Sequence, residues 1–228
     1  MKTTKHTELK QSAPKRITHA INFGNRKKQK ENLASKDLRR SNCYNTDFSA
    51  SDFSHASFRG AQFKACNFFH STFLATEFVA ANLKNSRFVE AKFEDAIFDS
   101  ATLSGTNFER ATFKNTIFVA TDTSAAKNLD LTQPGIRVFE TYPDLEISEA
   151  LERSLRIAMK NEYIKYARVL DTKTGAISTL SVMLLLEHFS EDALIKGLGL
   201  LKTDITQDFG TLSHLIQMLK AYQSDGVI

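Results

Sequence analysis

Few residues of this sequence have the types and spacing that catalytic or metal chemistry requires. It contains no C-x-x-C pair, no H-E-x-x-H motif, no Gly-rich phosphate loop and no nucleophile elbow. His188 and His214 lie in segments with helical spacing, and no cysteines or paired carboxylates stand near them at the sequence spacing of metal ligands. We therefore predict no catalytic residue, no metal site and no cofactor, and we predict that the protein is not an enzyme.

Basic residues are the other group that could do chemistry, through contact with an anion. Residues 1–40 hold 12 Lys and Arg against 3 Asp and Glu, although the whole chain carries a net charge of only +4. The candidate contacts for nucleic-acid phosphates or another anionic surface are Arg26, Lys27, Lys28, Lys30, Arg39 and Arg40. A solvated tail and a targeting signal remain open for the same segment. We predict that residues 1–30 form a basic, flexible N-terminal segment.

The middle of the chain repeats with a period of five. From Phe48 to Phe118, Phe or Leu stands at every fifth position, and a small residue stands two positions before each. Positions five apart drift by roughly 140° around a helix and point to opposite faces of a strand. The stretch is therefore neither one helix nor one strand. A short extended piece in each repeat, followed by a corner, brings every pair inward and builds a solenoid of stacked coils.

These repeats resemble the pentapeptide-repeat proteins, whose loose consensus is A-(D/N)-L-x-x. Residues 81–85, with the sequence ANLKN, match that consensus almost literally, and most other repeats carry Phe at the centre. The resemblance implies a right-handed quadrilateral β-helix with four repeats per coil. We predict about four to five coils, with the solenoid at residues 31–125. It also implies that residues 20 apart stack in columns.

Beyond the repeats, the spacing of apolar residues becomes helical. We predict a linker at residues 126–142 and a C-terminal α-helical domain at residues 143–228. Its four expected helices span about 148–171, 177–189, 190–202 and 206–222. The fold class is thus mainly β, a β-helix followed by a small α-helical bundle.

Apolar residues at outward positions of the repeats mark candidate contact surfaces. Val79, Ile97, Ile117 and Val119 share one side of the quadrilateral, and we predict that the C-terminal helices dock there. Phe69, Leu74 and Val89 are the candidate surface for an external partner. His55 and His70 are also outward but fall on adjacent sides, which does not favour a metal site between them.

We therefore expect a protein-binding scaffold whose partner the sequence does not identify, and a homodimer through the C-terminal helices is possible. Some pentapeptide-repeat proteins bind DNA gyrase by imitating duplex DNA, and others are secreted bacterial effectors, so both functions are alternatives. Nucleic-acid contact through the basic N-terminus is a further one. No apolar run is long enough for a membrane span, and Cys43 and Cys66 fall at inward positions as buried thiols. These features favour a cytoplasmic location.

Overall fold

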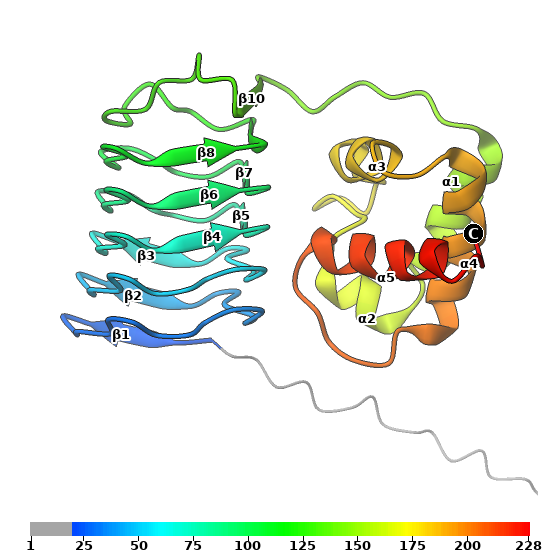
Figure 1. Ribbon diagram of the computed structural model, residues 1–228, viewed down its shortest axis with the longest axis horizontal. Helices are drawn as coiled ribbons and strands as arrows, with labels where there is room; N and C mark the ends of the chain where they lie inside the picture. The colour runs from blue at the N-terminus through cyan, green and yellow to red at the C-terminus, as the bar shows by residue number, and fades with distance from the viewer. Residues whose placement is uncertain (1–19) are drawn as a thin grey trace, which may run out of the picture.

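The computed structural model describes residues 20–228, and the first part of the predicted N-terminal segment, residues 1–19, lies outside them. The described chain forms two units side by side, a β-solenoid and a bundle of helices (Figure 1). An extended segment leaves the last coil of the solenoid and leads to the first helix. No helix among the described residues is long and apolar enough to cross a membrane.

Parallel strands 20 residues apart define the coils of the solenoid. Three of its sides are sheets and the fourth is held by single bridges such as Asp47 to Asn67 and Arg87 to Asn107. The first sheet contains β1 (Asn22–Gly24), β2 (Asn42–Tyr44) and β3 (Gln62–Lys64), and the second contains β4 (Thr72–Leu74), β6 (Lys92–Glu94) and β8 (Thr112–Lys114). The third contains β5 (Glu77–Val79), β7 (Ile97–Asp99), β9 (Thr116–Val119) and β10 (Ile136–Phe139). The predicted four repeats per coil are therefore confirmed.

The solenoid is longer than the repeat pattern indicated, with about six coils where four to five were predicted. Strand β1 pairs with β2 before residue 31, and β10 pairs with β9 inside the predicted linker. The end coils are held by the same backbone hydrogen bonds, but their inward side chains no longer follow the five-residue pattern. In the last coil Leu129, Leu131 and Ile136 pack on the core, whereas Val138, at the expected central position, is 48% exposed.

Each corner of the solenoid requires a residue with positive φ. These residues stand two positions after the central residue of each repeat, and their φ values lie between 46° and 72° from Asn25 to Ala120. β-branched side chains are strained in this conformation, and none occurs at these corners. The corner position is therefore a second regularity of the repeat, besides the two inward positions.

Stacked Phe rings fill the interior. The rings of Phe78 and Phe98 lie 4.6 Å apart at 6° to each other, and those of Phe98 and Phe118 lie 4.7 Å apart at 2°. The small inward residues leave room for the rings. Where such a residue is Ser or Thr, its hydroxyl mostly donates to a carbonyl of the preceding coil, as from Thr76 to the carbonyl of Phe53 at 2.8 Å, whereas Thr116 donates to the carbonyl of Lys114 in its own coil. These inward hydroxyls are thus satisfied, and the core has no polar cost at their positions.

In residues 20–228 the bundle contains five helices rather than the four predicted. They are α1 (Glu149–Ala158), α2 (Glu162–Ala167), α3 (Thr179–Leu186), α4 (Glu191–Asp204) and α5 (Leu212–Ser224). The first predicted helix is split because the Asn161 side chain accepts hydrogen bonds from the amides of Tyr163 and Ile164 and starts a new helix. The last helix begins at Leu212 instead of near Thr206, because the segment before it lies against the solenoid. A Cβ on Gly210 would come within 2.9 Å of the Ser57 Cβ.

Candidate interaction surfaces

One side of the solenoid is covered by the helices, and we call it the docked face. It consists of the outward residues of β5, β7 and β9 and those below them in the same columns: Asp37, Arg39, Ser57, Arg59, Glu77, Val79, Ile97, Asp99, Ile117 and Val119. Ile117 and Val119 are buried in one apolar cluster with the helices, and Ile97 packs against it. Val79 is half-buried and lines a cavity beside the bundle. The four residues predicted as a docking surface all lie on this face.

The half of the docked face on the N-terminal coils, which we call its lower half, is polar. Arg39 makes the contact with the helices that lies nearest to that end. Its guanidinium pairs with Asp37 at 2.6 Å, donates to the carbonyl of Tyr166 at 2.5 Å and lies 4.1 Å from the centre of the Tyr166 ring. Only 11% of the Arg39 side chain is exposed. The prediction that Arg39 contacts an external anion is therefore wrong, because the donors of this guanidinium are used within the chain.

Arg59 lies one coil above Arg39 and is less well satisfied. Its Nη2 donates to the carbonyl of Arg168 at 2.9 Å, whereas its buried Nε has no hydrogen-bond partner among the described residues. The buried hydroxyl of Ser57 also lacks one. Burial lowers the pKa of Arg59, and the nearby carboxylate of Glu77 opposes that shift. Two polar groups are therefore imperfectly paired on this half of the face.

Glu77 joins the docked face to the start of α5. Its side chain accepts a hydrogen bond from the amide of Leu212 at 2.5 Å, and the residue is only 5% exposed. Thr211, which precedes the helix, makes no side-chain capping bond. Glu77 therefore acts as the cap that the local sequence does not supply. Burial raises the pKa of Glu77 to about 7, while Arg59 and the Leu212 amide oppose the shift.

Two cavities flank the contact between Glu77 and Leu212. One, of about 340 Å³, lies towards His55 and His188, and the other, of about 630 Å³, lies towards Tyr142 and Lys173. Both are lined by residues of the solenoid and of the helical bundle. The two units therefore meet closely in the apolar upper half and through isolated polar contacts below it.

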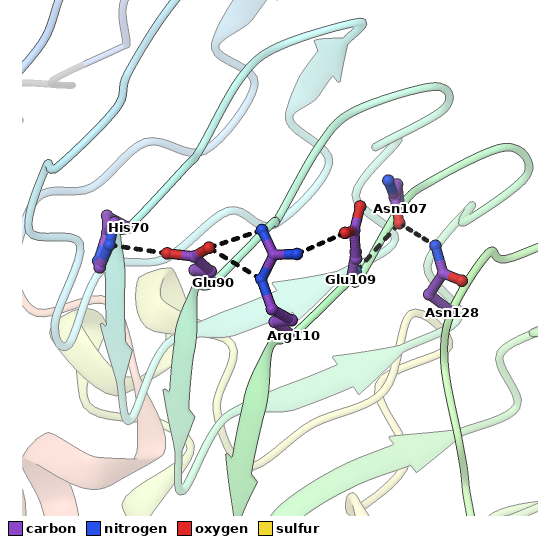
Figure 2. Close-up of polar contacts among 6 residues, drawn as sticks. All are labelled: His70, Glu90, Asn107, Glu109, Arg110 and Asn128. Carbon is purple, nitrogen blue, oxygen red and sulfur yellow. Dashed lines mark hydrogen bonds and ion pairs between the residues drawn. The ribbon is translucent and has the colours of Figure 1, made fainter.

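We call the side of the solenoid opposite the docked face the free face. Each coil has four sides with one repeat on each, so the central residues of the docked face stand two repeats away from those of the free face. Its central residues are Phe48, Phe68, Phe88 and Phe108, and its outward column includes Phe69 and Val89. Figure 2 shows the polar column at its edge. Glu90 contacts His70 at 2.8 Å and Arg110 at 2.7 Å, and Arg110 also contacts Glu109 at 2.7 Å.

The three residues predicted for an external partner do not form one surface. Phe69 is 37% exposed, and its ring meets that of His70 edge-on at 4.7 Å. Val89 is only 3% exposed, because the side chains of neighbouring coils stack in the same outward column, so the prediction of an exposed Val89 is wrong. Leu74 lies on β4, is half-buried and lines the smaller cavity next to the helices. Sequence reasoning also missed Tyr44, which is 56% exposed on β2.

The remaining basic candidates lie on the first two coils. Arg26, Lys27, Lys30 and Arg40 are exposed. Lys28 is half-buried, lies 4.8 Å from the centre of the Phe23 ring and pairs with Glu31 at 3.4 Å. The six predicted anion contacts are thus divided between an exposed group of four, one residue on the coil end and Arg39 at the docked face.

The described part of the chain contains no group of side chains arranged for catalytic or metal chemistry. Residues 20–228 contain no group of three or more His, Cys, Asp or Glu that could hold a metal ion. His214 stacks on Phe209 at 5.0 Å, and burial lowers the pKa of His188 and of His214. Cys43 and Cys66 are free and buried, and burial raises their pKa values to about 11 and about 12.

Comparison with known proteins identifies the repeats. The family described as pentapeptide repeats matches residues 37–69 and 76–115 with eight copies. No curated protein matches the chain.

Solved structures similar to this chain include pentapeptide-repeat proteins from several sources. The protein Rfr23 of the cyanobacterium Cyanothece 51142 is 16% identical, with 52% of this chain and 84% of that one covered and a TM-score of 0.36. A protein of the Arabidopsis thaliana thylakoid lumen is 17% identical, with 68% and 88% covered and a TM-score of 0.33. QnrB1, a plasmid-mediated fluoroquinolone resistance protein, is 16% identical, with 55% and 90% covered and a TM-score of 0.28. No likeness of function follows at these scores. The frame of five, the coils of 20 residues and the family match agree that the solenoid of this chain is a pentapeptide-repeat domain.

Proposed function

We propose that this protein is a non-catalytic scaffold that binds a protein partner through the free face, with Phe69 as the central apolar contact. The observation that carries the proposal is the position of Phe69, an exposed aromatic ring on the side of the solenoid opposite the helices. Aromatic residues are enriched at protein interfaces because they bury a large area with few rotatable bonds.

The surroundings of Phe69 support a protein partner. The neighbouring carboxylates of Glu90 and Glu109 are paired with His70 and Arg110, so the column has donors and acceptors but no field of one sign. Such a mixed polar rim around an apolar centre is typical of protein interfaces. The mimicry of DNA would need a strongly negative surface, which these pairs do not favour.

The test compares two exposed aromatic residues on different sides of the solenoid. Immobilised full-length wild type, Phe69→Ser and Tyr44→Ser are each incubated with a cell extract, and the captured proteins are quantified by mass spectrometry. We expect proteins that bind the wild type and Tyr44→Ser to be lost selectively from Phe69→Ser. Equal recovery on all three would refute the proposed surface. Circular dichroism confirms that the variants are folded.

The other functions have weaker support. Contact with nucleic acid would use the exposed group Arg26, Lys27, Lys30 and Arg40, and a salt-sensitive mobility shift lost on their replacement by Gln would favour it. A homodimer through the C-terminal helices and a cytoplasmic location remain predictions. Light scattering of the full-length chain decides the first, and fractionation of cells decides the second.

A further inference from the structure

The contact between Glu77 and α5 is poorly compensated for a buried carboxylate. The hydrogen bond from the Leu212 amide is the one found for this side chain in residues 20–228. Arg59 is close enough to influence the charge of Glu77, but the two form no ion pair within 4.0 Å. The Leu212 amide and Arg59 favour the ionised form of Glu77, but burial disfavours that form more strongly, so the docked arrangement is most stable when Glu77 carries a proton.

The surroundings of this contact indicate that the two units can separate there. The cavities of about 340 and 630 Å³ lie on either side of it, and the buried Ser57 hydroxyl and Arg59 Nε lack partners in the described chain. Separation would let water fill both cavities and satisfy both atoms. Residues 140–148, which connect the solenoid to α1, form neither strand nor helix.

We propose that Glu77 is a proton-controlled latch, which holds the start of α5 on the docked face when protonated and weakens that contact when it ionises. Release would expose the lower half of the docked face to water while the solenoid keeps its coils. The latch is independent of the partner surface around Phe69, which lies on the opposite side.

The direction of the pH dependence follows from where the proton is held. In the docked state Glu77 keeps its proton up to a pH of about 7, against the ordinary value of 4.5 for an exposed side chain. The docked state therefore binds more protons between these values, and docking weakens as the pH rises through them. Between pH 6 and pH 8 this linkage corresponds to a loss of about tenfold in the docking equilibrium.

Other charged groups face the same contact, and their effect on docking must be distinguished from that of Glu77. From the solenoid these are Arg39, Arg59, Asp99, His55 and Asp95, and from the helices and the loop after α2 they are Arg168, Asp171, Lys173, Glu187, His188 and Lys220. Burial lowers the pKa of His188, so docking opposes its protonation and its effect on docking has the opposite sign to that of Glu77.

Hydrogen exchange at the Leu212 amide tests the latch in the full-length chain. NMR exchange rates at pH 6 and pH 8 are divided by the intrinsic rates for each pH, for the wild type, Glu77→Gln, Glu77→Ala and Glu94→Gln. Glu94 is an exposed carboxylate on β6, paired with Lys114, and serves as the matched control. Circular dichroism confirms the fold of each variant.

We expect the protection of Leu212 to fall about tenfold from pH 6 to pH 8 in the wild type and in Glu94→Gln. Gln keeps an acceptor for the amide but cannot ionise, so Glu77→Gln should lose this dependence. Glu77→Ala should reduce protection at both pH values. A wild-type protection that is constant or rises with pH would overturn the proposal, and so would an unchanged slope in Glu77→Gln.

Discussion

Replacing Phe88 by Ala is the most direct test of the stacked core. Phe88 is fully buried, and its ring lies 4.8 Å from that of Phe68 and 5.4 Å from that of Phe108 in the same column. It also meets Phe73 and Phe93 of the adjacent side at 5.4 and 5.5 Å. Removing a buried ring with so many neighbours costs about 3–5 kcal/mol, because the rigid coils cannot collapse into the cavity.

The two buried cysteines provide an assay that reports on the solenoid alone. Burial raises the pKa values of Cys43 and Cys66 to about 11 and 12, so neither thiol reacts readily at pH 8 while the coils are closed. Labelling then measures the population of the opened solenoid. A loss of about 3 kcal/mol corresponds to labelling that is faster by more than about a hundredfold.

Phe113→Ala is the matched control for this prediction. Phe113 belongs to the neighbouring column but is only half-buried, near the end of the repeat block, so its loss should accelerate labelling much less. An effect of Phe88→Ala that is below about tenfold, or no larger than that of Phe113→Ala, would refute the reasoning that central rings carry the stability of the solenoid.

Three further changes probe other parts of the structure. Ala81→Leu should destabilise the solenoid by about 1–3 kcal/mol through overpacking, and an unchanged melting temperature would contradict the inward position of Ala81. Arg39→Ala should weaken docking by about 1.5–3 kcal/mol by removing the charged hydrogen bond to Tyr166, seen as faster amide exchange in α2 without faster thiol labelling. Glu90→Gln should leave the melting temperature unchanged because its partners His70 and Arg110 are exposed, and a clear drop would show that the column is structural.

The solenoid could be predicted closely because its repeat is local. A small residue, a Phe two positions later and a corner residue each constrain the chain within five residues, and repetition removes the ambiguity of any single one. The end coils escaped prediction because backbone pairing with the neighbouring coil holds them even where the side chains leave the frame, as at Val138.

The contact surfaces required the tertiary structure. Val89 has the sequence signature of an outward residue like Phe69, but only the packing of adjacent coils makes it buried. Arg39 belongs to a basic segment in the sequence, yet its position beside Tyr166 makes it a docking residue. No local sequence pattern predicts that Glu77 caps α5, because its hydrogen bond with the Leu212 amide joins residues 135 positions apart.

The sequence alone thus determined the frame of five residues, the inward rings and the presence of a helical domain, since these depend on local spacing. The tertiary structure decided which outward residues remain exposed and which carboxylate is buried. Such properties depend on contacts between distant segments, and a periodic pattern does not specify those contacts.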